Sequence, residues 1–338
     1  MLESPQLEQM RTERVSSQRR MRPAVASIAV EIPPGRLTTE ELAERLGVSA
    51  DWIVSRTGIR ERPMARPDER LADYAARAGA AALSRAGVDA ADLDLVIAAT
   101  MTQDQLTPNA GPVIAHALGA HRAGAFDVGA ACTAFLTGLS LGAAQIEAGR
   151  AERVLVVGAD FITRINNWDD KKTAPLFADA AGAAVLAPTE ADRGGIGPIV
   201  LGSDGSYAQA IHAEHDDRTL HMDGPEVYKN AIRRMSEATI AAVERAGLVL
   251  EDIDLFVYHQ ANARITRALA EKFDLPAERV VDCIEMLGNS SAATLPLGLA
   301  FAERDGRLKR GARVLLGAFG AGFTWGGGVI EWGAGGGG

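Results

Sequence analysis

Apolar and polar positions along the chain follow two periods, one typical of β-strands and one typical of α-helices. Short apolar runs predict buried strands over residues 24–32, 93–100, 153–157, 252–259 and 314–316. Stretches rich in Ala and Leu predict helices over residues 40–46, 71–86, 112–118, 133–148 and 226–246. Helices that alternate with apolar strands indicate a layered α/β fold.

The second half of the chain repeats the pattern of the first half at one constant offset. Residues 86–95 correspond to 246–255, and the loop that contains Cys132 corresponds to 288–292. Matches between alanine-rich helices can arise by chance, but one unbroken offset favours a duplicated helix–strand–loop–helix–strand module. Two such halves would pack about a pseudo-twofold axis, and equivalent strand ends would meet near that axis.

This repeat and the polar start of the chain divide the sequence into three parts. Residues 1–22 are expected to form a flexible N-terminal extension. Residues 23–187 form an N-terminal half that carries Cys132, and residues 188–338 form a C-terminal half that carries His259 and Asn289. The boundary falls in a polar, Gly-rich segment that begins at Pro188.

Charge and composition exclude several classes of function. The 338 residues carry a net charge of −9, which argues against broad nucleic-acid binding. No apolar run approaches the roughly 18 residues of a membrane span, and residues 1–20 lack the apolar core of a signal peptide. The two cysteines, Cys132 and Cys283, do not make a disulfide framework, so we expect a protein of the reduced cytoplasm.

Cys132 is the strongest candidate for chemistry in the N-terminal half. An apolar run leads through Gly and Ala into this cysteine, and the predicted helix 133–148 begins directly after it. The unpaired N–H groups and the positive dipole end of a helix N-terminus stabilise a thiolate, which is the nucleophilic form of cysteine. The alternative is a structural role, because free cysteine is among the most buried residue types.

The candidate partners of Cys132 come from the C-terminal half. His259 ends an apolar strand, Asn262 follows it, and Asn289 lies in the loop that corresponds to the Cys132 loop. Functional groups of α/β proteins gather at the carboxyl ends of strands, and a thiolate beside an imidazole and amides suits acyl transfer. A satisfied structural histidine is the alternative for His259. The two cysteines are far apart and lack paired spacing, so we predict no metal site.

Two further segments are candidates for binding. The glycine-rich segment 317–328 follows the last predicted strand, and its backbone N–H groups can help to form an oxyanion hole. It lacks the Lys and Ser/Thr of a phosphate-binding loop. The segment 51–62 contains one Trp, three Arg and one Gly, which predicts an exposed binding loop, although a solvated loop with one packed Trp explains the same pattern.

Together these segments resemble β-ketoacyl-ACP synthase III, one of the thiolase-like condensing enzymes. The matching stretches cover nearly the whole chain, namely 52–62, the Cys132 loop, 177–186, 259–262, 288–293 and 319–326. The resemblance implies a five-layered α-β-α-β-α fold built from two duplicated halves, and a homodimer. It also implies a decarboxylative Claisen condensation of an acyl-CoA primer with malonyl-ACP through an acyl-Cys132 intermediate, which initiates fatty-acid or polyketide synthesis. No cofactor would be tightly bound.

The resemblance also implies roles for individual residues. The catalytic residues would be Cys132, His259 and Asn289, and the backbone N–H groups of Cys132 and Ala321 would form the oxyanion hole. Contacts to CoA would come from Trp52, Arg56, Arg164, Gly224 and Asn262. Acyl carrier protein would bind a basic patch of Arg264, Arg233 and Arg234, although a solvated helix face explains the last two equally well. Thr107 would lie in the acyl pocket, where its small side chain implies room for a longer or branched acyl group.

Departures from the family pattern leave other functions open. Ala321 and Pro225 replace a Gly and an Asn that the family often has, and the segment 204–221 is shorter than usual. One alternative is a related acyltransferase that moves the acyl group to an alcohol or amine. Another is a non-catalytic partner subunit, which the retained triad disfavours. A thiolase would need a second Cys near the last glycine cluster, and a type III polyketide synthase would fit poorly at 52–62 and 323–326.

Overall fold

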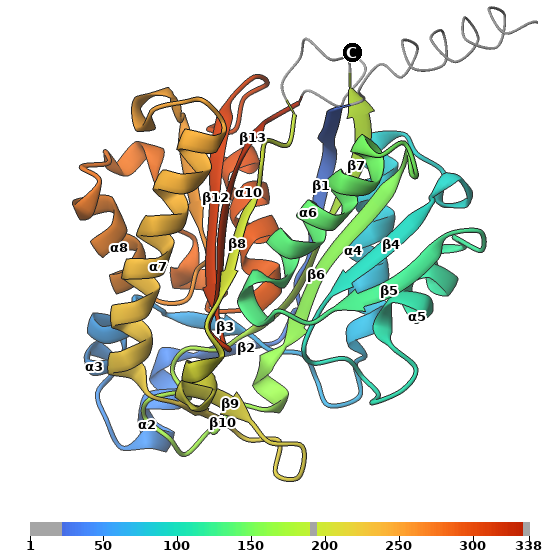
Figure 1. The fold of residues 1–338 in the computed structure, drawn as a ribbon. Coiled ribbons are helices and arrows are strands. Elements are labelled where there is room, and N and C mark those ends of the chain that lie inside the picture. Colours follow the sequence, from blue (N-terminus) through green and yellow to red (C-terminus); the bar gives the residue numbers. More distant parts are fainter. Residues whose placement is uncertain (1–21, 190–194, 334–338) are drawn as a thin grey trace, which may run out of the picture.

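The computed structural model describes residues 22–189 and 195–333 and shows two β-sheets with helices on their faces (Figure 1). The expected extension 1–22 lies outside the described residues, except for Arg22, which begins the first strand. Within the described ranges, no helix is both long enough and apolar enough to cross a membrane.

The first sheet is built from the N-terminal half and has the strand order β1-β7-β6-β4-β5. β4 pairs in parallel with β5 and β6, whereas β7 is antiparallel to β1 and β6. The strands are β1 (Arg22–Glu31), β4 (Leu95–Ala99), β5 (Gly124–Val128), β6 (Val154–Phe161) and β7 (Asp179–Thr189). β5 therefore lies at one edge of this sheet.

The second sheet repeats this arrangement in the order β11-β12-β13-β8. Its strands are β8 (Val200–Ser203), β11 (Leu255–Tyr258), β12 (Arg313–Gly320) and β13 (Thr324–Glu331). The registers follow the sequence repeat, because Leu95 of β4 aligns with Val154 and Leu255 of β11 aligns with Val314. Both partners are shifted by the offset of the sequence repeat, so the duplication predicted from the sequence is present in the sheets.

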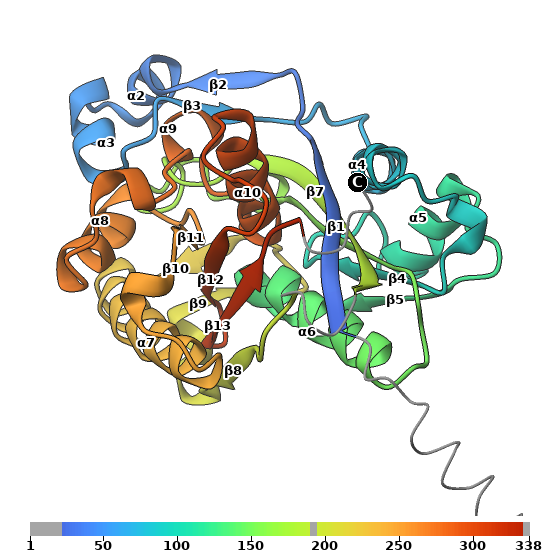
Figure 2. The ribbon, with the colours of Figure 1, turned by 90° about the horizontal axis from the view of Figure 1, so that it is seen from above.

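Helices fill three layers around the two sheets, which makes five layers in all (Figure 2). The central layer contains α6 (Ala134–Glu147) and α10 (Thr294–Arg304). The outer layers contain α4 (Leu71–Ala86) and α5 (Ala110–Leu118) on the first sheet, and α7 (Gly224–Arg245) and α8 (Ala263–Lys272) on the second. The predicted five-layered fold is confirmed.

The side chains of β6 show why the layers form. Val154 and Val156 belong to the central core between the sheets, whereas Leu155 and Val157 belong to the outer core under α4 and α5. Successive side chains of a strand point to opposite faces, so a strand that is apolar at every position buries both faces of its sheet. β12 alternates in the same way between the central core and the core under α7.

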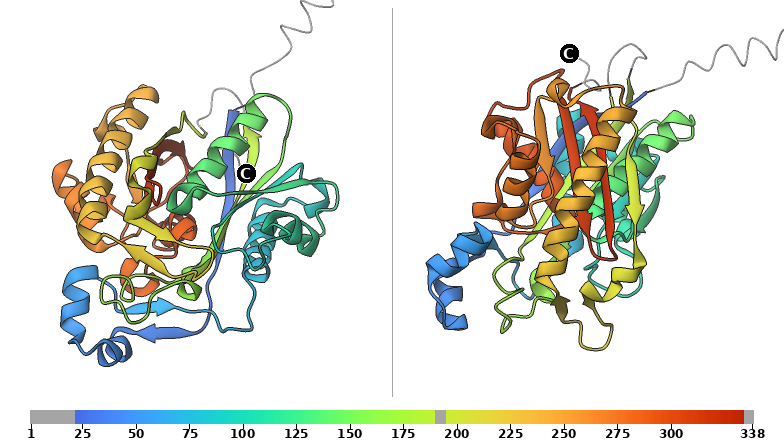
Figure 3. Two further views of the ribbon diagram at one scale, coloured as in Figure 1. Left: turned by 60° about the horizontal axis from the view of Figure 1, so that its bottom comes forward. Right: turned by 60° about the vertical axis from the view of Figure 1, so that its left-hand side comes forward.

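The remaining elements lie at one end of the molecule, which is turned forward on the left of Figure 3. Two antiparallel strand pairs are found there, β2 (Arg36–Thr38) with β3 (Glu61–Pro63) and β9 (Ile211–Ala213) with β10 (Leu220–Met222). The short helices of this end are α2 (Thr39–Leu46), α3 (Ala50–Thr57) and α9 (Ile284–Leu287).

The segment 51–62 is not the exposed loop that we predicted. Ser49 caps α3, and Ile53 is fully buried, so the first half of the segment is a packed helix. Arg62 is also fully buried and donates to the carbonyl of Pro175. Burial lowers the pKa of Arg62 to about 10. This arginine therefore stabilises the fold instead of facing a ligand.

The glycine-rich segment 317–328 is mostly strand. β12 continues to Gly320 and β13 begins at Thr324, so residues 321–323 form the turn between them. A Cβ on Gly326 would lie 2.7 Å from a backbone oxygen of β8. Close packing of neighbouring backbones is thus the reason for a glycine there, not the flexibility of a loop.

Candidate active site

A cavity of about 610 Å³ lies at the end of the molecule that carries α3 and the β9–β10 hairpin. Residues from both halves line it, and Cys132, His259 and Asn289 are among them. The apolar part of the lining includes Met101, Ile162, Leu176, Phe177, Met235 and Phe319. The exposed cations of the lining, which we call the basic rim, are Arg56, Lys171, Lys172 and Arg264. Among the described residues, no group of three or more His, Cys, Asp or Glu side chains is placed to hold a metal ion.

Cys132 lies on a sharp turn of residues 129–133, which we call the first elbow. Ala131 has φ +46°, a left-handed conformation that residues other than glycine rarely adopt, and the 3-10 turn Ala131–Thr133 starts there. α6 begins at Ala134, so Cys132 lies just before a helix N-terminus, as the sequence predicted. The cysteine is partly exposed and lines the cavity.

The end of β12 packs directly against the first elbow. A Cβ added to Gly320 would lie 2.8 Å from the amide nitrogen of Cys132 and 3.2 Å from its Cβ, so this position requires glycine. Thr324, after the turn, shares a 2.9 Å hydrogen bond with the Thr133 hydroxyl. Ala321 lies in that turn and lines the cavity. The two residues proposed for the oxyanion hole therefore face the same space.

The surroundings of Cys132 correct one expectation from the sequence. We expected the helix N-terminus to favour the thiolate, but burial raises the pKa of the Cys132 thiol to about 12, and the charge of Asp160 adds to the rise. The polar hydroxyl of Ser291 lowers this pKa without cancelling the increase. One side of the residue meets the cavity, and water there offsets part of the desolvation. At neutral pH the resting side chain is still a thiol.

Asn289 opens a second sharp turn of residues 289–293, which we call the second elbow. Ser291 has φ +51°, and the 3-10 turn Ser291–Ala293 leads into α10, so the backbone repeats the first elbow at the equivalent place in the C-terminal half. The Ser291 amide donates to Asn289 Oδ1 at 2.9 Å. This bond fixes the carboxamide and leaves its NH2 group as the end that can donate to a substrate.

His259 follows β11 and is almost fully buried. Its Nδ1 shares a 2.6 Å hydrogen bond with Thr294 Oγ1 at the start of α10, and its amide donates to the Gly317 carbonyl. Burial lowers the pKa of His259 to about 3, because the charged imidazolium is disfavoured away from water. The resting site therefore holds a neutral thiol and a neutral imidazole.

Four of the five residues expected to contact CoA line the cavity, namely Trp52, Arg56, Gly224 and Asn262. The Arg56 guanidinium lies over the Trp52 ring, 4.4 Å from its centroid. Asn262 has a structural role as well, because its side chain caps α8 and donates to the Arg56 carbonyl. Trp52 and Arg56 therefore place a flat aromatic surface and a cation side by side at the basic rim.

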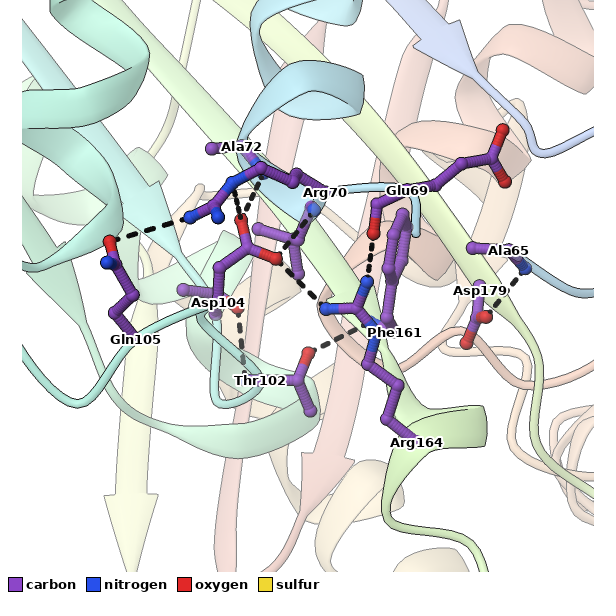
Figure 4. A network of polar contacts seen from close by, with 12 residues as sticks. Ala65, Glu69, Arg70, Ala72, Thr102, Asp104, Gln105, Phe161, Arg164 and Asp179 are labelled. Atoms are coloured by element: carbon purple, nitrogen blue, oxygen red, sulfur yellow. Dashed lines mark hydrogen bonds and ion pairs between the residues drawn. The ribbon is translucent and has the colours of Figure 1, made fainter. Parts of the chain in front are cut away.

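Arg164, the fifth residue, is not part of the cavity lining. Its guanidinium pairs with Asp104 at 2.9 Å, donates to the Glu69 carbonyl and lies over the Phe161 ring (Figure 4). Asp104 also accepts from two amides at the N-terminus of α4. This network fastens the loop between β4 and α5 to α4, so the structure gives Arg164 a clear structural role. Its contact with CoA stays a prediction.

Thr107 lies on the same loop between β4 and α5. It is exposed and is not part of the cavity lining of its own chain. A single chain therefore gives no acyl pocket at Thr107, and the effect of this residue on acyl length stays a prediction.

The predicted carrier-protein patch does not form one uniform surface. Arg264 belongs to the basic rim, and Arg233 is exposed on α7. Arg234 is more deeply placed, pairs with Glu237 at 3.0 Å and lies 4.2 Å from the centroid of the Trp325 ring. The guanidinium of Arg234 thus already has partners within the chain, which makes a contact between Arg234 and a carrier protein less favourable.

Several residues of the site were missed in the sequence. Lys171 and Lys172 belong to the basic rim, Ser291 lines the cavity, and Asp160 acts on Cys132. The available signals were an adjacent pair of lysines and a lone carboxylate inside an otherwise apolar strand. Each signal is common in proteins without this chemistry, so neither pointed to the site by itself.

Comparisons with known sequences agree with this geometry. Family models described as 3-Oxoacyl-[acyl-carrier-protein (ACP)] synthase III and its C terminal match residues 126–205 and 243–332. A relative named Beta-ketoacyl-[acyl-carrier-protein] synthase III from Symbiobacterium thermophilum is 40% identical, and the match covers 91% of this chain and 98% of the relative. The relative of the same name from Listeria welshimeri is also 40% identical, with 93% of this chain and all of the relative covered.

Solved structures are similar over nearly the whole chain. The 3-oxoacyl-[acyl-carrier-protein] synthase III of Aquifex aeolicus superposes with a TM-score of 0.89 at 35% identity, covering 92% of this chain and 100% of that one. The priming β-ketosynthase of the R1128 polyketide biosynthetic pathway superposes with a TM-score of 0.88 at 35% identity, covering 92% of this chain and 96% of that one.

Proposed function

This chain belongs to the β-ketoacyl-[acyl-carrier-protein] synthase III family, and we propose that it joins an acyl-CoA primer to malonyl-ACP. The products are a β-ketoacyl-ACP, CoA and CO2. The observation that carries the proposal is one cavity, lined by Cys132, His259 and Asn289, with an apolar interior and a basic rim. The relatives are condensing enzymes, which favours condensation over a simple acyltransferase and over a non-catalytic partner subunit.

In the first half-reaction the Cys132 sulfur attacks the thioester carbonyl of acyl-CoA. The new C–S bond forms, the bond to the CoA sulfur breaks, and CoA leaves with the proton that the thiol gives up. Because the resting thiol is neutral, the proton departs as the bond forms. The amides of Cys132 and Ala321 stabilise the tetrahedral oxyanion, and one such donor is typically worth about 3 kcal/mol.

In the second half-reaction His259 and Asn289 hold the thioester carbonyl of malonyl-ACP while CO2 leaves. The resulting carbanion attacks the acyl-Cys132 carbonyl, the bond to the Cys132 sulfur breaks, and the released thiolate takes up a proton from solvent. Asn289 is prepared for this role, since the Ser291 amide already occupies its carbonyl oxygen and leaves the NH2 group to donate. Fixed donors in a site with little water act strongly on developing charge.

The outer part of the cavity suits an anionic, extended substrate. Trp52 and Arg56 offer a stacking surface and a cation for the adenine end of CoA. Lys171 and Lys172 add positive charge to the same rim, which favours the phosphates of CoA. Arg264, on the rim, is also placed to meet an acidic carrier protein. The cations of this group are exposed, so their contribution depends on salt.

We propose a homodimer formed along the β5 edge. Phe126 on this strand is 40% exposed, and Leu106 on the adjoining loop is 80% exposed. An open edge and exposed large apolar side chains favour pairing with a second copy of the chain. Thr107 would then lie beside this interface, and an effect on acyl length would come through the neighbouring subunit.

The reaction needs a reduced thiol and no tightly bound cofactor. Both Cys132 and Cys283 are free, and the nucleophile would be lost if Cys132 were oxidised. A reducing, cytoplasmic setting is therefore part of the proposal. No cofactor is needed to form the carbanion, because the departure of CO2 from malonyl-ACP provides the driving force.

Intact-protein mass spectrometry with a panel of acyl-CoAs, followed by addition of malonyl-ACP, tests this function. We expect an acyl adduct on Cys132 that disappears when malonyl-ACP is added, with release of CO2 and a β-ketoacyl-ACP. The primer that gives the fastest adduct identifies the preferred acyl group. Acceptance of acetyl-CoA together with refusal of octanoyl- and branched-chain CoA would refute the expectation of a roomy acyl pocket.

Other outcomes would reject condensation. An adduct that malonyl-ACP does not discharge would favour an acyltransferase with another acceptor. No adduct with any acyl-CoA would favour a non-catalytic role or a carrier-bound donor.

A further inference from the structure

Asp160 is a carboxylate at the end of β6 that the mechanism above does not use. It is fully buried. Its Oδ1 accepts from Thr100 Oγ1 at 3.1 Å, from the Met101 amide at 2.9 Å and from Thr102 Oγ1 at 2.9 Å. Its Oδ2 accepts from the Ala292 amide at 3.2 Å. Four donors therefore surround one buried acid.

The directions of these hydrogen bonds indicate a carboxylate and not a carboxylic acid. Thr100 Oγ1 already accepts from the Thr102 amide, and Thr102 Oγ1 already accepts from the Phe161 amide. The hydroxyl protons are therefore free to point at Asp160. Burial raises the pKa of Asp160, and the donors around it act against that rise. Oδ1 accepts from three donors and Oδ2 from one, and these donors favour the charged form against the effect of burial.

Asp160 also joins the two halves of the molecule at the active site. The threonines that bind it follow β4 of the N-terminal half, whereas Ala292 belongs to the second elbow of the C-terminal half. The strand and the elbow touch closely, since a Cβ on Gly158 would lie 2.5 Å from the Ala292 carbonyl oxygen. The Ser291 hydroxyl, one residue earlier in the elbow, donates to Met101 Sδ at 3.8 Å and lowers the pKa of both Asp160 and Cys132.

We propose that Asp160 is a positioning residue for the condensation, which holds the second elbow and Asn289 in place opposite Cys132 and sets a fixed negative charge beside the thiol. The positioning part rests on the proposed function. The charge part does not, because a carboxylate acts on a neighbouring thiol whatever reaction follows.

The groups that face Cys132 make the effect of the charge predictable. β6 contributes the anion of Asp160, His259 after β11 is neutral, and the second elbow contributes the Ser291 hydroxyl. The anion raises the pKa of the Cys132 thiol, and the hydroxyl lowers it. Burial is the largest cause of the raised pKa, and the charge of Asp160 adds to it, which further limits alkylation and oxidation before a thioester enters the cavity.

The variant Asp160→Asn separates these effects because it preserves the size of the side chain and removes its charge. The pH dependence of iodoacetamide alkylation at Cys132, followed by mass spectrometry, should move to lower pH. Below the thiol pKa, alkylation should speed up tenfold for each unit by which that pKa falls. Condensation with malonyl-ACP should slow by at least tenfold. The amide side chain of the variant offers one acceptor oxygen in place of two, and its NH2 group would face the donors that now bind the carboxylate, so the elbow that carries Asn289 is disturbed. The acyl adduct on Cys132 should still form.

Two companion variants control the interpretation. Ser291→Ala keeps the carboxylate and removes the hydroxyl, so alkylation of Cys132 should slow, the opposite direction to Asp160→Asn. Asp179→Asn removes another buried acid, which accepts hydrogen bonds from Thr163 and from the Ala65 amide. Although the chain beside Asp179 pairs with Asn289 through the Ala178 amide, the charge of Asp179 is not among the causes that shift the Cys132 pKa, so the alkylation profile of Cys132 should stay unchanged.

A folded Asp160→Asn protein with an unchanged alkylation profile and condensation within twofold of wild type overturns the proposal. If this variant does not fold, Ser291→Ala decides, and unchanged alkylation there overturns the charge part. Alkylation needs no substrate, so its outcome is independent of the proposed function. A wild-type protein that forms no acyl adduct rejects the proposed function, and the alkylation profiles still decide whether Asp160 acts on the thiol.

Discussion

The two elbows of the molecule have the same backbone conformation, but different side chains occupy their equivalent positions. Ala131 and Ser291 both have a positive φ, each begins a 3-10 turn, and each turn leads into a helix of the central layer. In the first elbow the next residue is Cys132, which is partly exposed to the cavity. In the second elbow the equivalent residue is Ala292, which is buried.

Each elbow packs against a strand of the opposite half, and the two contact residues are equivalent. Asp160 of β6 and Gly320 of β12 hold the same place in the sequence repeat and in the register of their sheets. At the second elbow the Ala292 amide donates to the Asp160 carboxylate. At the first elbow Gly320 lies against the Cys132 amide and brings no side chain.

This difference shows how one duplicated turn gives two functions. A sharp turn before a helix of the central layer is present in both halves. In the second elbow a permanent carboxylate occupies the position that faces the Ala292 amide and makes the turn a structural anchor. In the first elbow Gly320 leaves this position open, and the proposed mechanism assigns it to a transient oxyanion. The first elbow therefore differs from the second in two ways: it carries Cys132, and the strand packed against it has Gly320 in place of a carboxylate.

The largest effect is expected from removing the thiol of the first elbow. Cys132→Ala should abolish the acyl adduct and all condensation, because no other side chain offers a nucleophile at that turn. The measurement is intact mass after incubation with the preferred acyl-CoA. Cys283→Ala is the matched control, since it removes the other free thiol, which is buried, and should keep the adduct. An adduct that persists without Cys132 would contradict the assignment of the nucleophile.

The next largest effect is expected from the donor of the second elbow. Asn289→Ala should lower kcat for condensation by about 10²–10³, the usual loss for one oxyanion donor, while acylation of Cys132 continues. Rates of adduct formation and of CO2 release measure the two steps separately. The equivalent residue of the first elbow is Gly129, where an added Cβ meets nothing within 4 Å. Gly129→Ala should therefore change kcat for condensation little. A loss of kcat as large as that of Asn289→Ala would contradict the assignment of the donor to the second elbow.

A smaller effect is expected from filling the open position of the first elbow. Gly320→Ala places a Cβ 2.8 Å from the Cys132 amide nitrogen, and a displacement of the nucleophile by about 1 Å costs roughly 100-fold in rate. Single-turnover acylation is the measurement. Gly205→Ala, at an open position, serves as control. Acylation at the wild-type rate in Gly320→Ala would show that the space is not needed.

The smallest effect is expected on stability, from the neutral His259 that lies between the elbows. Its pKa is about 3 in the folded protein and about 6.5 when unfolded. The unfolded state therefore binds the extra proton below pH 6.5, and stability falls as pH decreases, by about 2 kcal/mol between pH 8 and pH 5. Urea unfolding of wild type and His259→Gln should show this contribution lost in the variant. Parallel curves for the two proteins would mean that His259 is not held neutral.

Much of the fold was predictable because it depends on local periodicity. The helix predicted at 71–86 has the bounds of α4, and the predicted strands at 153–157 and 314–316 lie within or adjoin β6 and β12. A single constant offset in the sequence indicated two equivalent halves, and the strand registers show the same offset. The repeat also placed Asn289 in the loop equivalent to the Cys132 loop, but the strand end expected before it is the helix α9, and only Cys132 and His259 follow strands.

The sequence by itself determined the layers, the duplication and the three residues that meet in the cavity, because apolar periodicity and strand ends are local properties. Tertiary structure decided the rest. It made the first half of 51–62 a packed helix, separated Arg164 from the cavity, and raised the pKa of Cys132 by burial, with a further contribution from Asp160. Burial and the approach of charges depend on which distant segments pack together, and no local pattern in the chain contains that information.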